Sequence, residues 1–598
     1  MCGVIGCVGD NPVESVITGM KRMEYRGYDS YGFCAFKEGS KLLCRDVGII
    51  SQNTRLDAYA DTLKDYNYNS AIGHTRWATH GEVTKGNAHP QHDNQETIFV
   101  VHNGTVDNSP ADMLDTKYIV QQLKVRTTQH WMVAESEDRF TKPLRKKPTI
   151  STEDYLMIVN SVIQNLEGDN AFLVSFSKLP DHIFCASKGD KSLLVTNNGY
   201  ISSDSYAISG MAKEAEVLTN STACVSSSGI ISSVRNYNSP PNRVVVIPEE
   251  SEDAKMSEEH YMLKEIKEQY SLMEDMGNYP MYHPPFRPKR LHLIGCGSSY
   301  YAAMWAKVWF EELAKIPTKV TYGSEAINAT LKDPKETRIY ISQSGETKDI
   351  IRASHNERSD SIFIVTNQPF SHLGNSFFNT IDIGANIERG VAATKTFTLT
   401  CYALWELAWH WSSESEENEL KVLDYQYALA NGIKHVLDRE QDISTIAKIV
   451  SQYDNALFLG RHWDYPIALE GALKLKEVSY IHAEGMPAAE MKHGPIALVD
   501  EETPSIFTVT GSFGMDAIIS NMREVKSRNG KVFAITSPVN YDRVKEVADW
   551  TFQTYALHNP AMEPLSANVV LQLLAYYVAV EKGLNPDRPR NLAKSVTV

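Results

Sequence analysis

Short apolar segments separated by turn residues fill the first 247 positions of the chain. Examples of segments with the length and composition of β-strands are residues 2–8, 70–74, 97–102, 171–176 and 243–247. Helical periodicity is found at residues 13–23 and 155–166. Many short strands with few helices predict a mixed β-sandwich with flanking helices, an α+β fold.

The pattern changes after residue 247. Residues 248–258 (PEESEDAKMSE) are acidic and almost free of apolar side chains, which predicts a linker. An amphipathic helix is expected at residues 259–276, and from about residue 288 apolar strands alternate with helices. This alternation is typical of an α/β doubly wound parallel sheet.

An internal duplication is visible in this second half. Residues 291–297, 339–345 and 362–367 resemble residues 456–461, 506–512 and 532–537 in the same order. The offsets are 165 residues (294 to 459), 168 (342 to 510) and 170 (365 to 535). Buried strands resemble one another by chance, but the nearly constant offset favours two copies of one doubly wound domain.

The composition narrows the classes of function. The net charge of -15 argues against general nucleic-acid binding. No apolar run approaches the roughly 20 residues of a membrane span, and the N-terminus lacks the features of a secretory signal. The eight scattered cysteines favour reduced thiols in a cytoplasmic compartment. His89 and His92 form an HxxH without other ligand candidates nearby, so no metal is expected.

Cys2 directly follows the initiator methionine. Removal of Met1 would give Cys2 a free α-amino group, and terminal amines have a pKa of about 8, low enough to act as a base for the thiol. The thiolate can attack a carboxamide to give a thioester and release ammonia. The structural alternative is a small residue that opens a strand.

Two polar loops that contain glycine follow strand-like segments in the same half: HTRWATHG (74–81) and HNG (102–104). Asn103 and Gly104 are suited to donate a side-chain amide and a backbone N–H to an oxyanion, each worth roughly 3–4 kcal/mol. Arg76 is suited to hold a carboxylate in a bidentate fork. HNG is also a common turn sequence, and both interpretations can hold.

These motifs, with Cys2-Gly3 and EYRGYDS (24–30), resemble the class II glutamine amidotransferases, and EYRGYDS resembles their glucosamine-6-phosphate synthase branch. The resemblance implies an N-terminal-nucleophile sandwich of αββα type in which Cys2 is the nucleophile. It implies that Trp77 gates the passage of ammonia. The residues that would bind glutamine or form the oxyanion hole are Arg76, Thr79, His80, Asn103, Gly104 and Asp115.

One segment departs from that family. The family usually has a longer helical segment between the HNG strand and an Asp-Thr-Glu sequence, whereas VHNGTVDNSPADMLDTKYI is much shorter. Asp115 is the apparent match for the aspartate that binds the amine of glutamine. Residues 125–152, with the basic TKPLRKKPT, have no recognised counterpart.

Polar turns also follow strands in the second half. SQSGET (342–347) and GCGSSY (295–300) each join a strand-like segment to a helical one, and VAATKT (391–396) is a third turn of this kind. Backbone N–H groups, hydroxyls and helix N-termini favour a phosphomonoester there, although ordinary N-caps are the alternative. The absence of GxxxxGK[ST] and GxGxxG argues against ATP and dinucleotide sites.

Residues 468–484 are predicted to form one buried helix. Glu470, Lys474 and Glu477 fall at i, i+4 and i+7 on one face, where a carboxylate can move a proton between C2 and C1 of a ketose phosphate. A solvated salt-bridge stripe is the alternative. His493 lies in a Gly-Pro turn, and Lys594 lies in a tail apolar enough to dock.

SQSGET, LEGALKLKE, KHGP and PRNLAKSVTV (589–598) together resemble the isomerase half of the same family, which has two sugar-isomerase domains. The resemblance implies that Glu477 is the proton-shuttling base beside Lys474, and that Lys594 forms a Schiff base with the ketose. It also implies that His493 assists ring opening from the neighbouring subunit. The sugar-phosphate residues would be Ser298, Ser299, Ser342, Gln343, Ser344, Thr347, Glu388 and Ala593. Ala393 replaces a common serine and removes one hydroxyl contact.

The expected domains are a glutaminase (2–247), the linker (248–258), two sugar-isomerase domains (259–440 and 441–588) and a tail that completes the active site (589–598). By the resemblance, the chain converts fructose 6-phosphate and glutamine into glucosamine 6-phosphate and glutamate, the first step toward UDP-N-acetylglucosamine. A cytoplasmic homodimer without cofactor, metal, nucleic acid or membrane is expected.

Two other functions fit the motifs. An uncoupled glutaminase fused to a sugar-phosphate isomerase or deglycase would account for the short segment before Asp115 and for Ala393. A sugar-phosphate-sensing protein would be expected to lack catalytic groups, yet all four candidates are present: Cys2, Glu477, His493 and Lys594. Only a coupled synthase forms aminosugar in step with glutamate.

Overall fold

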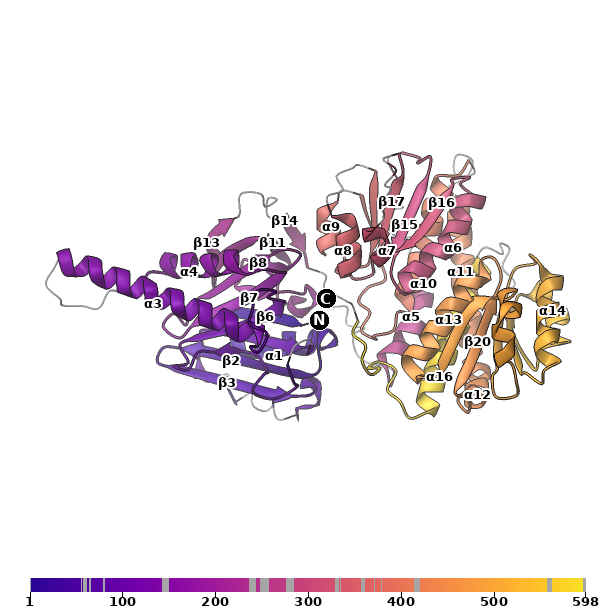
Figure 1. The fold of residues 1–598 in the computed structure, drawn as a ribbon, viewed down its shortest axis with the longest axis horizontal. Coiled ribbons are helices and arrows are strands. Elements are labelled where there is room, and N and C mark those ends of the chain that lie inside the picture. Colours follow the sequence, from indigo (N-terminus) through magenta and orange to yellow (C-terminus); the bar gives the residue numbers. More distant parts are fainter. Residues whose placement is uncertain are drawn as a thin grey trace. The chain divides into compact units, whose positions relative to one another are not determined.

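The computed structural model divides the chain into two compact units, which lie within residues 1–254 and 255–594 (Figure 1). Most of the predicted linker, residues 248–257, lies outside the described residues. The described residues are 2–54, 56, 62–63, 66–78, 81–141, 150–235, 243–247, 258–275, 284, 286–328, 333, 335–355, 361–369, 371–377, 379–413, 420–555 and 562–594.

Unit 1 contains two sheets whose described pairings are all antiparallel, so the sandwich is not mixed in strand direction. The eight-stranded sheet has the order β14 (Arg243–Val246), β11 (Glu214–Thr219), β9 (Ser192–Val195), β10 (Tyr200–Ser202), β1 (Gly3–Val8), β4 (Ser70–Arg76), β2 (Ser30–Lys37) and β3 (Ser40–Val47). The six-stranded sheet has the order β13 (Gly229–Arg235), β12 (Ser221–Ser226), β8 (Ile183–Lys188), β7 (Asn170–Phe176), β6 (Ile98–Gly104) and β5 (Gln91–His92).

Alternate residues of one strand show how the layers pack, because successive side chains of a strand point to opposite faces. Phe99 and Val101 of β6 join the core between the two sheets. Ile98 and Val100 of the same strand pack instead under helices α3 (Asp115–Thr141) and α4 (Thr152–Asn165). The six-stranded sheet is therefore covered on both faces.

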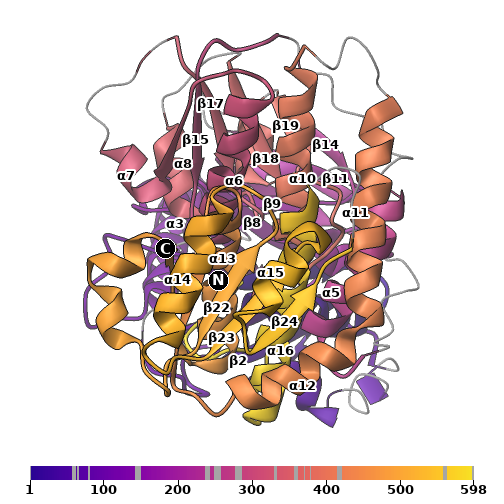
Figure 2. The same cartoon turned by 90° about the vertical axis from the view of Figure 1, so that its right-hand side faces the viewer.

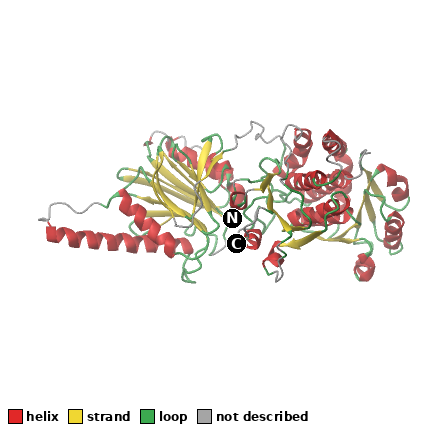
Figure 3. Cartoon of the chain, turned by 90° about the horizontal axis from the view of Figure 1, so that it is seen from above, coloured by secondary structure: helices red, strands yellow, loops and turns green. Residues whose placement is uncertain are grey.

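Helix α1 (Pro12–Arg22) covers the outer face of the other sheet. A Cβ added at Gly19 would lie 2.1 Å from Ile5 of β1, so this helix approaches the strand closely. Unit 1 thus has the predicted αββα layers, and Figure 3 shows its strands gathered between helices. Its short 3-10 helices are η1 (Glu24–Arg26), η2 (Ile50–Gln52) and η4 (Tyr206–Ile208).

Unit 2 contains two five-stranded sheets whose pairings are all parallel. The first has the order β16 (Thr318–Tyr322), β15 (Leu291–Gly295), β17 (Thr337–Ile341), β18 (Ile362–Thr366) and β19 (Asn379–Asp382). The second has the order β21 (His482–Pro487), β20 (Asn455–Gly460), β22 (Ser505–Val509), β23 (Val532–Thr536) and β24 (Trp550–Gln553), visible in Figure 2.

The two sheets have the same strand order, which confirms the predicted duplication. In each copy the first strand in sequence lies between the second and the third, so the order reverses beside β15 and beside β20. The copies share one hydrophobic core, to which Leu293 and Phe363 of the first sheet and Phe458 and Ile535 of the second all contribute. Neither copy is an isolated domain.

Helices surround both sheets of unit 2 (Figure 2). The α-helices are α5 (Tyr261–Asp275), α6 (Ser298–Glu312), α7 (Gly323–Ile327), α8 (Lys348–Ser354), α9 (His372–Ser376), α10 (Lys395–His410), α11 (Leu420–Asp438), α12 (Glu440–Val450), α13 (Asp464–Ser479), α14 (Met515–Lys526), α15 (Tyr541–Lys545) and α16 (Glu563–Glu581). The 3-10 helices are η7 (Glu490–His493), η8 (Pro495–Leu498) and η9 (Pro538–Asn540).

The prediction of one helix across residues 468–484 is wrong at its C-terminal end. Helix α13 ends at Ser479, and Tyr480 takes a left-handed conformation with φ of 62°. From His482 the chain pairs with β20 as the parallel edge strand β21. Helical periodicity continues past the break, but pairing with β20 decides the structure of the last residues.

Among the described residues, one helix, α16, is long and apolar enough to cross a membrane by length and composition alone. Its most apolar window is 89% buried within the protein, and its residues Val569, Leu571 and Leu573 belong to the core of unit 2. That burial is typical of a core helix. The expectation that no apolar run approaches the length of a membrane span is therefore wrong for this helix by length and composition.

Candidate functional site

The reversal of strand order beside β15 places two of the predicted polar turns together. The turn after β15 leads into α6, and the turn after β17 leads into α8. In doubly wound sheets, ligands bind outside the carboxyl ends of strands at such a reversal. The two turns predicted to bind phosphate thus lie together at the strand-order reversal of the first copy.

The turn after β17 is closely folded. The hydroxyl of Ser342 lies 2.9 Å from that of Thr347 and accepts the N–H of Gly345 at 3.1 Å. Gly345 has φ of 62°, and a Cβ there would lie 1.7 Å from the Ser371 hydroxyl, so only glycine fits. Gln343 and Ser344 are half-buried in this turn, and Ser298 and Ser299 are half-buried at the N-terminus of α6. Hydroxyls and backbone N–H groups at a helix N-terminus suit an anion.

The equivalent turn of the second copy is already occupied by a carboxylate. Asp464 at the start of α13 accepts the N–H of Thr510 at 2.9 Å, the Thr510 hydroxyl at 2.6 Å and the N–H of Gly511 at 3.3 Å. Burial raises the pKa of Asp464 to about 6, although these hydrogen bonds lower it. In the second copy a carboxylate of the protein thus accepts the hydrogen bonds that the turn can donate.

The charged stripe of α13 faces the first copy. Lys474 contacts Glu470 at 3.3 Å and Glu477 at 2.7 Å, which confirms that the three side chains share one face. Ser298 donates to Glu470 at 2.9 Å, and Lys474 donates to Ser298 at 3.3 Å. Glu470 and Lys474 are fully buried, whereas the Glu477 side chain is 20% exposed. The stripe is therefore not a solvated one, and Glu477 is the carboxylate open to a ligand.

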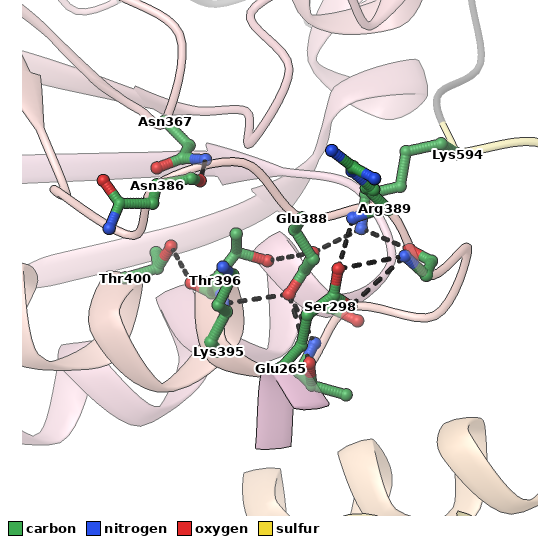
Figure 4. Close-up of polar contacts among 12 residues, drawn as sticks. Glu265, Ser298, Asn367, Asn386, Glu388, Arg389, Lys395, Thr396, Thr400 and Lys594 are labelled. Carbon is green, nitrogen blue, oxygen red and sulfur yellow. Dashed lines mark hydrogen bonds and ion pairs between the residues drawn. The ribbon is translucent and has the colours of Figure 1, made fainter. Parts of the chain in front are cut away.

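A second buried ion pair joins the tail to the loop before α10 (Figure 4). Lys594 donates to the carboxylate of Glu388 and, at 2.7 Å, to the carbonyl of Gly390. Glu388 also accepts the N–H of Thr394 at 2.9 Å and both the N–H and hydroxyl of Thr396 at 3.1 and 2.7 Å. Burial opposes the ionisation of Glu388, but Lys594 and these donors hold its pKa near 2. The tail docks as predicted as far as Lys594.

The other predicted residues of unit 2 differ in exposure. Ala593 is half-buried beside Lys594, and Ala393 is half-buried in the loop that holds Glu388. His493 lies at the end of η7 and is exposed. His493 makes no contact with the stripe or with Lys594 that would place it in this pocket.

The candidate nucleophile of unit 1 lies at the start of β1. Cys2 is half-buried, and its thiol contacts the carbonyl of Trp77 at 3.5 Å. Burial raises the pKa of this thiol, while the nearby charge of Arg76 lowers it and that of Asp115 raises it. Arg76 and Asp115 thus lie within electrostatic range of Cys2, which supports the assignment of Asp115 despite the short segment before it.

The motif EYRGYDS supports the loop that follows β4. Asp29 accepts the N–H of Ala78 at 2.8 Å, and the Tyr28 ring packs edge-on against Trp77 with centroids 5.2 Å apart. A Cβ at Gly27 would lie 2.5 Å from the backbone of Arg76. The motif therefore positions Arg76 and Trp77. Thr79 and His80 lie outside the described residues.

Three histidines beneath this site form a buried network that the sequence analysis missed. His74 contacts the carbonyl of His102 at 2.9 Å and packs against the His89 ring, with centroids 4.0 Å apart. Thr116 bridges His89 and His102 at 3.2 Å to each. Burial lowers the pKa of all three imidazoles. The HxxH histidine His89 thus belongs to a structural network that joins β4, β6 and α3.

Asn103 and Gly104, the residues predicted to form the oxyanion hole, end β6 directly after His102. Asn103 is buried, and Gly104 has φ of 150°, where a Cβ would lie 2.1 Å from the carbonyl of Asp169. Asp115 begins α3, and its carboxylate lies 3.7 Å from the ring of His102. Among the described residues, no three His, Cys, Asp or Glu side chains are arranged to hold a metal ion.

A family model and a solved structure match unit 2 and agree with the duplication found there. The family model of the SIS domain matches residues 286–409 and 449–582. The C-terminal domain of glucosamine-fructose-6-phosphate aminotransferase from Francisella tularensis covers 57% of this chain and 100% of its own, with a TM-score of 0.52 and 32% identity.

Curated relatives cover the full length. The chain is 34% identical to the glutamine–fructose-6-phosphate aminotransferase [isomerizing] of Aquifex aeolicus and 34% identical to that of Chlorobaculum tepidum. Each alignment covers 100% of both chains. These relatives match both units of the chain over their full length, and the chain belongs to the family of isomerizing glutamine–fructose-6-phosphate aminotransferases.

Proposed function

We propose that this chain transfers the amide nitrogen of glutamine to fructose 6-phosphate and isomerises the product to glucosamine 6-phosphate, releasing glutamate. The observation that carries the proposal is the burial of Lys594 against Glu388 in the loop before α10. An amine held in a buried pocket is suited to form an imine with a ketose carbonyl. Membership of the aminotransferase family supports the same chemistry.

In unit 1, Cys2 attacks the side-chain carboxamide of glutamine. Its α-amine, freed by removal of Met1, takes the thiol proton, and the thioester forms as ammonia leaves. Asn103 and Gly104 donate to the oxyanion. Arg76 holds the α-carboxylate and Asp115 the α-amine, with Thr79 and His80 completing the glutamine loop.

In unit 2, the phosphate binds the turns after β15 and β17, through Ser298, Ser299, Ser342, Gln343, Ser344 and Thr347. Lys594 forms an imine at C2, and ammonia displaces it. Glu477 then moves a proton between C1 and C2, which converts the ketose imine into the aldose. Lys474 fixes Glu477, and Glu388 and Ala593 line the pocket beside Lys594.

Ammonia must reach C2 without meeting bulk water, because in water at neutral pH it becomes ammonium, which is not a nucleophile. We assign Trp77 to that passage. We also propose a cytoplasmic homodimer in which the exposed His493 serves the partner's pocket and assists ring opening. Glucosamine 6-phosphate would then feed the synthesis of UDP-N-acetylglucosamine.

Cys2→Ala tests the coupling. The variant should form neither glutamate nor glucosamine 6-phosphate from glutamine, yet still convert fructose 6-phosphate to glucose 6-phosphate. Cys7→Ala, further along the same strand, is the matched control and should keep both activities. Aminosugar made from glutamine by Cys2→Ala at the wild-type rate would overturn the nucleophile assignment.

Two measurements separate the alternatives. Wild-type protein should form glutamate and aminosugar in a fixed ratio, whereas an uncoupled glutaminase would form glutamate alone. The mass of the mature N-terminus should show Cys2 as the first residue. Full glutaminase activity in protein that retains Met1 would contradict the role of the α-amine.

A further inference from the structure

Helix α5 supports the loop that carries Glu388 at three places. The hydroxyl of Tyr261 accepts from Arg389 at 2.9 Å, and Glu268 accepts from Lys395 at 2.7 Å. Between them, Glu265 reaches the turn at Arg389 and Gly390 (Figure 4). The start of α5 is itself fixed by Asp587, which accepts the N–H groups of Tyr261 and Met262 at 2.8 and 2.7 Å.

Of the three α5 side chains that contact this loop, Glu265 has the closest connection to Lys594. Its carboxylate accepts the N–H of Arg389, and each of its oxygens lies 3.2 Å from the N–H of Gly390. The carbonyl of that same Gly390 accepts from Lys594. One residue therefore separates the Glu265 carboxylate from the acceptor that fixes the amine.

A buried carboxylate in this position is costly unless it has a task. Glu265 is only 2% exposed. Burial and the neighbouring Glu388 raise its pKa to about 8, and Lys594 and Lys395 lower it. The carboxylates of Glu265 and Glu388 thus both lie near Lys594. Because like charges repel, the protonation of one carboxylate depends on that of the other.

We propose that Glu265 is a positioning residue for imine formation: by holding the Arg389–Gly390 turn, it sets the Gly390 carbonyl and the Glu388 carboxylate around Lys594. The inference rests on the proposed function, because it requires Lys594 to react with the ketose. The tail and the loop before α10 form the surroundings of Lys594. The proposal adds Glu265, from helix α5, to them.

The charged groups around Glu265 set the pH dependence. Glu388 and Arg389 face it from the loop, Lys395 from α10 and Lys594 from the tail, while Glu268 lies one turn along α5. While Glu265 is ionised, it holds the two N–H groups strongly and adds negative charge beside Lys594. The rate of imine formation should therefore rise with pH as Glu265 ionises, with a midpoint near pH 8.

The experiment traps the imine directly. Full-length protein is incubated with fructose 6-phosphate, without glutamine, and reduced with borohydride, and the adduct on Lys594 is measured by peptide mass spectrometry from pH 6 to 9. Glu265→Gln keeps the shape and one acceptor oxygen but removes the charge. Glu274→Gln is the matched control, since Glu274 is an exposed residue near the end of the same helix and contacts Tyr270.

Above about pH 8, Glu265→Gln should trap roughly tenfold to a hundredfold more slowly than wild type, as expected for a displaced reacting group, with the change near pH 8 lost and the KM for fructose 6-phosphate little altered. Glu274→Gln should keep the wild-type rate and pH profile. Gly390→Ala provides a second test, because its Cβ would lie 2.8 Å from a Glu265 oxygen and displace the turn with both charges intact. It should slow trapping but keep the pH dependence.

The outcomes distinguish the two proposals. If wild-type protein forms no fructose 6-phosphate adduct at Lys594, the proposed function fails. If wild type forms the adduct and Glu265→Gln forms it at the same rate with the same pH profile, the positioning role of Glu265 fails alone. A Glu265→Gln variant that traps slowly only because its KM has risen in proportion would also overturn the positioning role.

Discussion

Ser298, at the N-terminus of α6 in the first copy of the duplicated domain, donates a hydrogen bond of 2.9 Å to Glu470, on α13 of the second copy. The two residues are 172 positions apart. Glu470 is fully buried, and its second oxygen has no hydrogen-bond partner within the described part of the chain. The phosphate turn of one copy is thus held by a carboxylate of the other.

Glu470→Gln should change how stability depends on pH. Burial raises the pKa of Glu470 to about 7, with Lys474 lowering it and Glu477 raising it. The folded state keeps this proton until about pH 7, whereas the unfolded chain releases it near pH 4.5. The contribution of Glu470 to the free energy of unfolding therefore falls as pH rises through this window, by on the order of 3 kcal/mol.

The glutamine variant lacks that fall, so its stability relative to wild type should increase between pH 4.5 and 7.5. Denaturant unfolding at several pH values measures the difference. Glu490→Gln, at an exposed site on η7, should show a constant difference. A Glu470→Gln difference that is equally flat with pH would contradict a buried, protonated Glu470.

Ala393→Ser should improve sugar-phosphate binding. Ala393 is half-buried in the loop whose next residue, Thr394, donates to Glu388. A serine hydroxyl that reaches the ligand is worth about 0.5–1.5 kcal/mol, so the KM for fructose 6-phosphate should fall roughly twofold to tenfold, with the KM for glutamine unchanged. Ala392→Ser is the control, because Ala392 is buried and a hydroxyl there should cost stability instead. An unaltered KM would show that the hydroxyl does not reach the sugar phosphate.

Gly104→Ala should inactivate the glutaminase alone. Its φ of 150° disfavours any side chain, and the new Cβ would lie 2.1 Å from the carbonyl of Asp169. The cost should exceed about 2 kcal/mol, because the strand end must move. Gly210→Ala has φ of 69° but open space around its Cβ, so it carries only the backbone strain.

Glutaminase rates, isomerisation rates and melting of both variants separate the two effects. Gly210→Ala should keep its glutaminase activity, and both variants should isomerise fructose 6-phosphate as wild type does. Comparable glutaminase activity in the two variants would contradict the placement of Gly104 in the oxyanion site.

Local sequence determined most of what could be predicted. The five strand segments and two helical segments named for unit 1 lie within a few residues of observed elements, whereas strands such as β2 and β3 and the long helix α3 were not among them. The nearly constant offsets revealed the duplication in unit 2. The turns after β15 and β17 follow from glycine and hydroxyl residues between a strand and a helix. These signals depend on neighbours in sequence, where propensity and periodicity act.

Contacts between distant residues could not be predicted. Glu265 meets Gly390, 125 positions later, and the three histidines of unit 1 come together only when β4, β6 and α3 pack. Asp464 was not among the residues singled out from the sequence, yet its carboxylate accepts hydrogen bonds from Thr510 and Gly511 in the turn of the second copy. Each of these groups is polar and buried, and only the fold determines which partner satisfies it.

Asp115→Asn tests whether Asp115 binds the α-amine of glutamine. The segment before Asp115 is shorter than in the family. Asp115 accepts the N–H of Thr116 at 2.7 Å with one oxygen, and its side chain is 17% exposed, so the carboxylate remains accessible. A hydrogen bond to a charged group contributes about 1.5–3 kcal/mol. Loss of the charge should therefore raise the KM for glutamine roughly tenfold to a hundredfold, with a smaller effect on kcat.

A substrate without the α-amine makes this prediction specific. Wild type should strongly prefer glutamine to glutaramate, the same molecule lacking the amine, whereas Asp115→Asn should lose most of that preference. Asp112→Asn, an exposed change in the same short segment, should keep it. If Asp115→Asn discriminates between the two amides as well as wild type does, the amine is held by another residue, and the shortened segment has moved that role elsewhere.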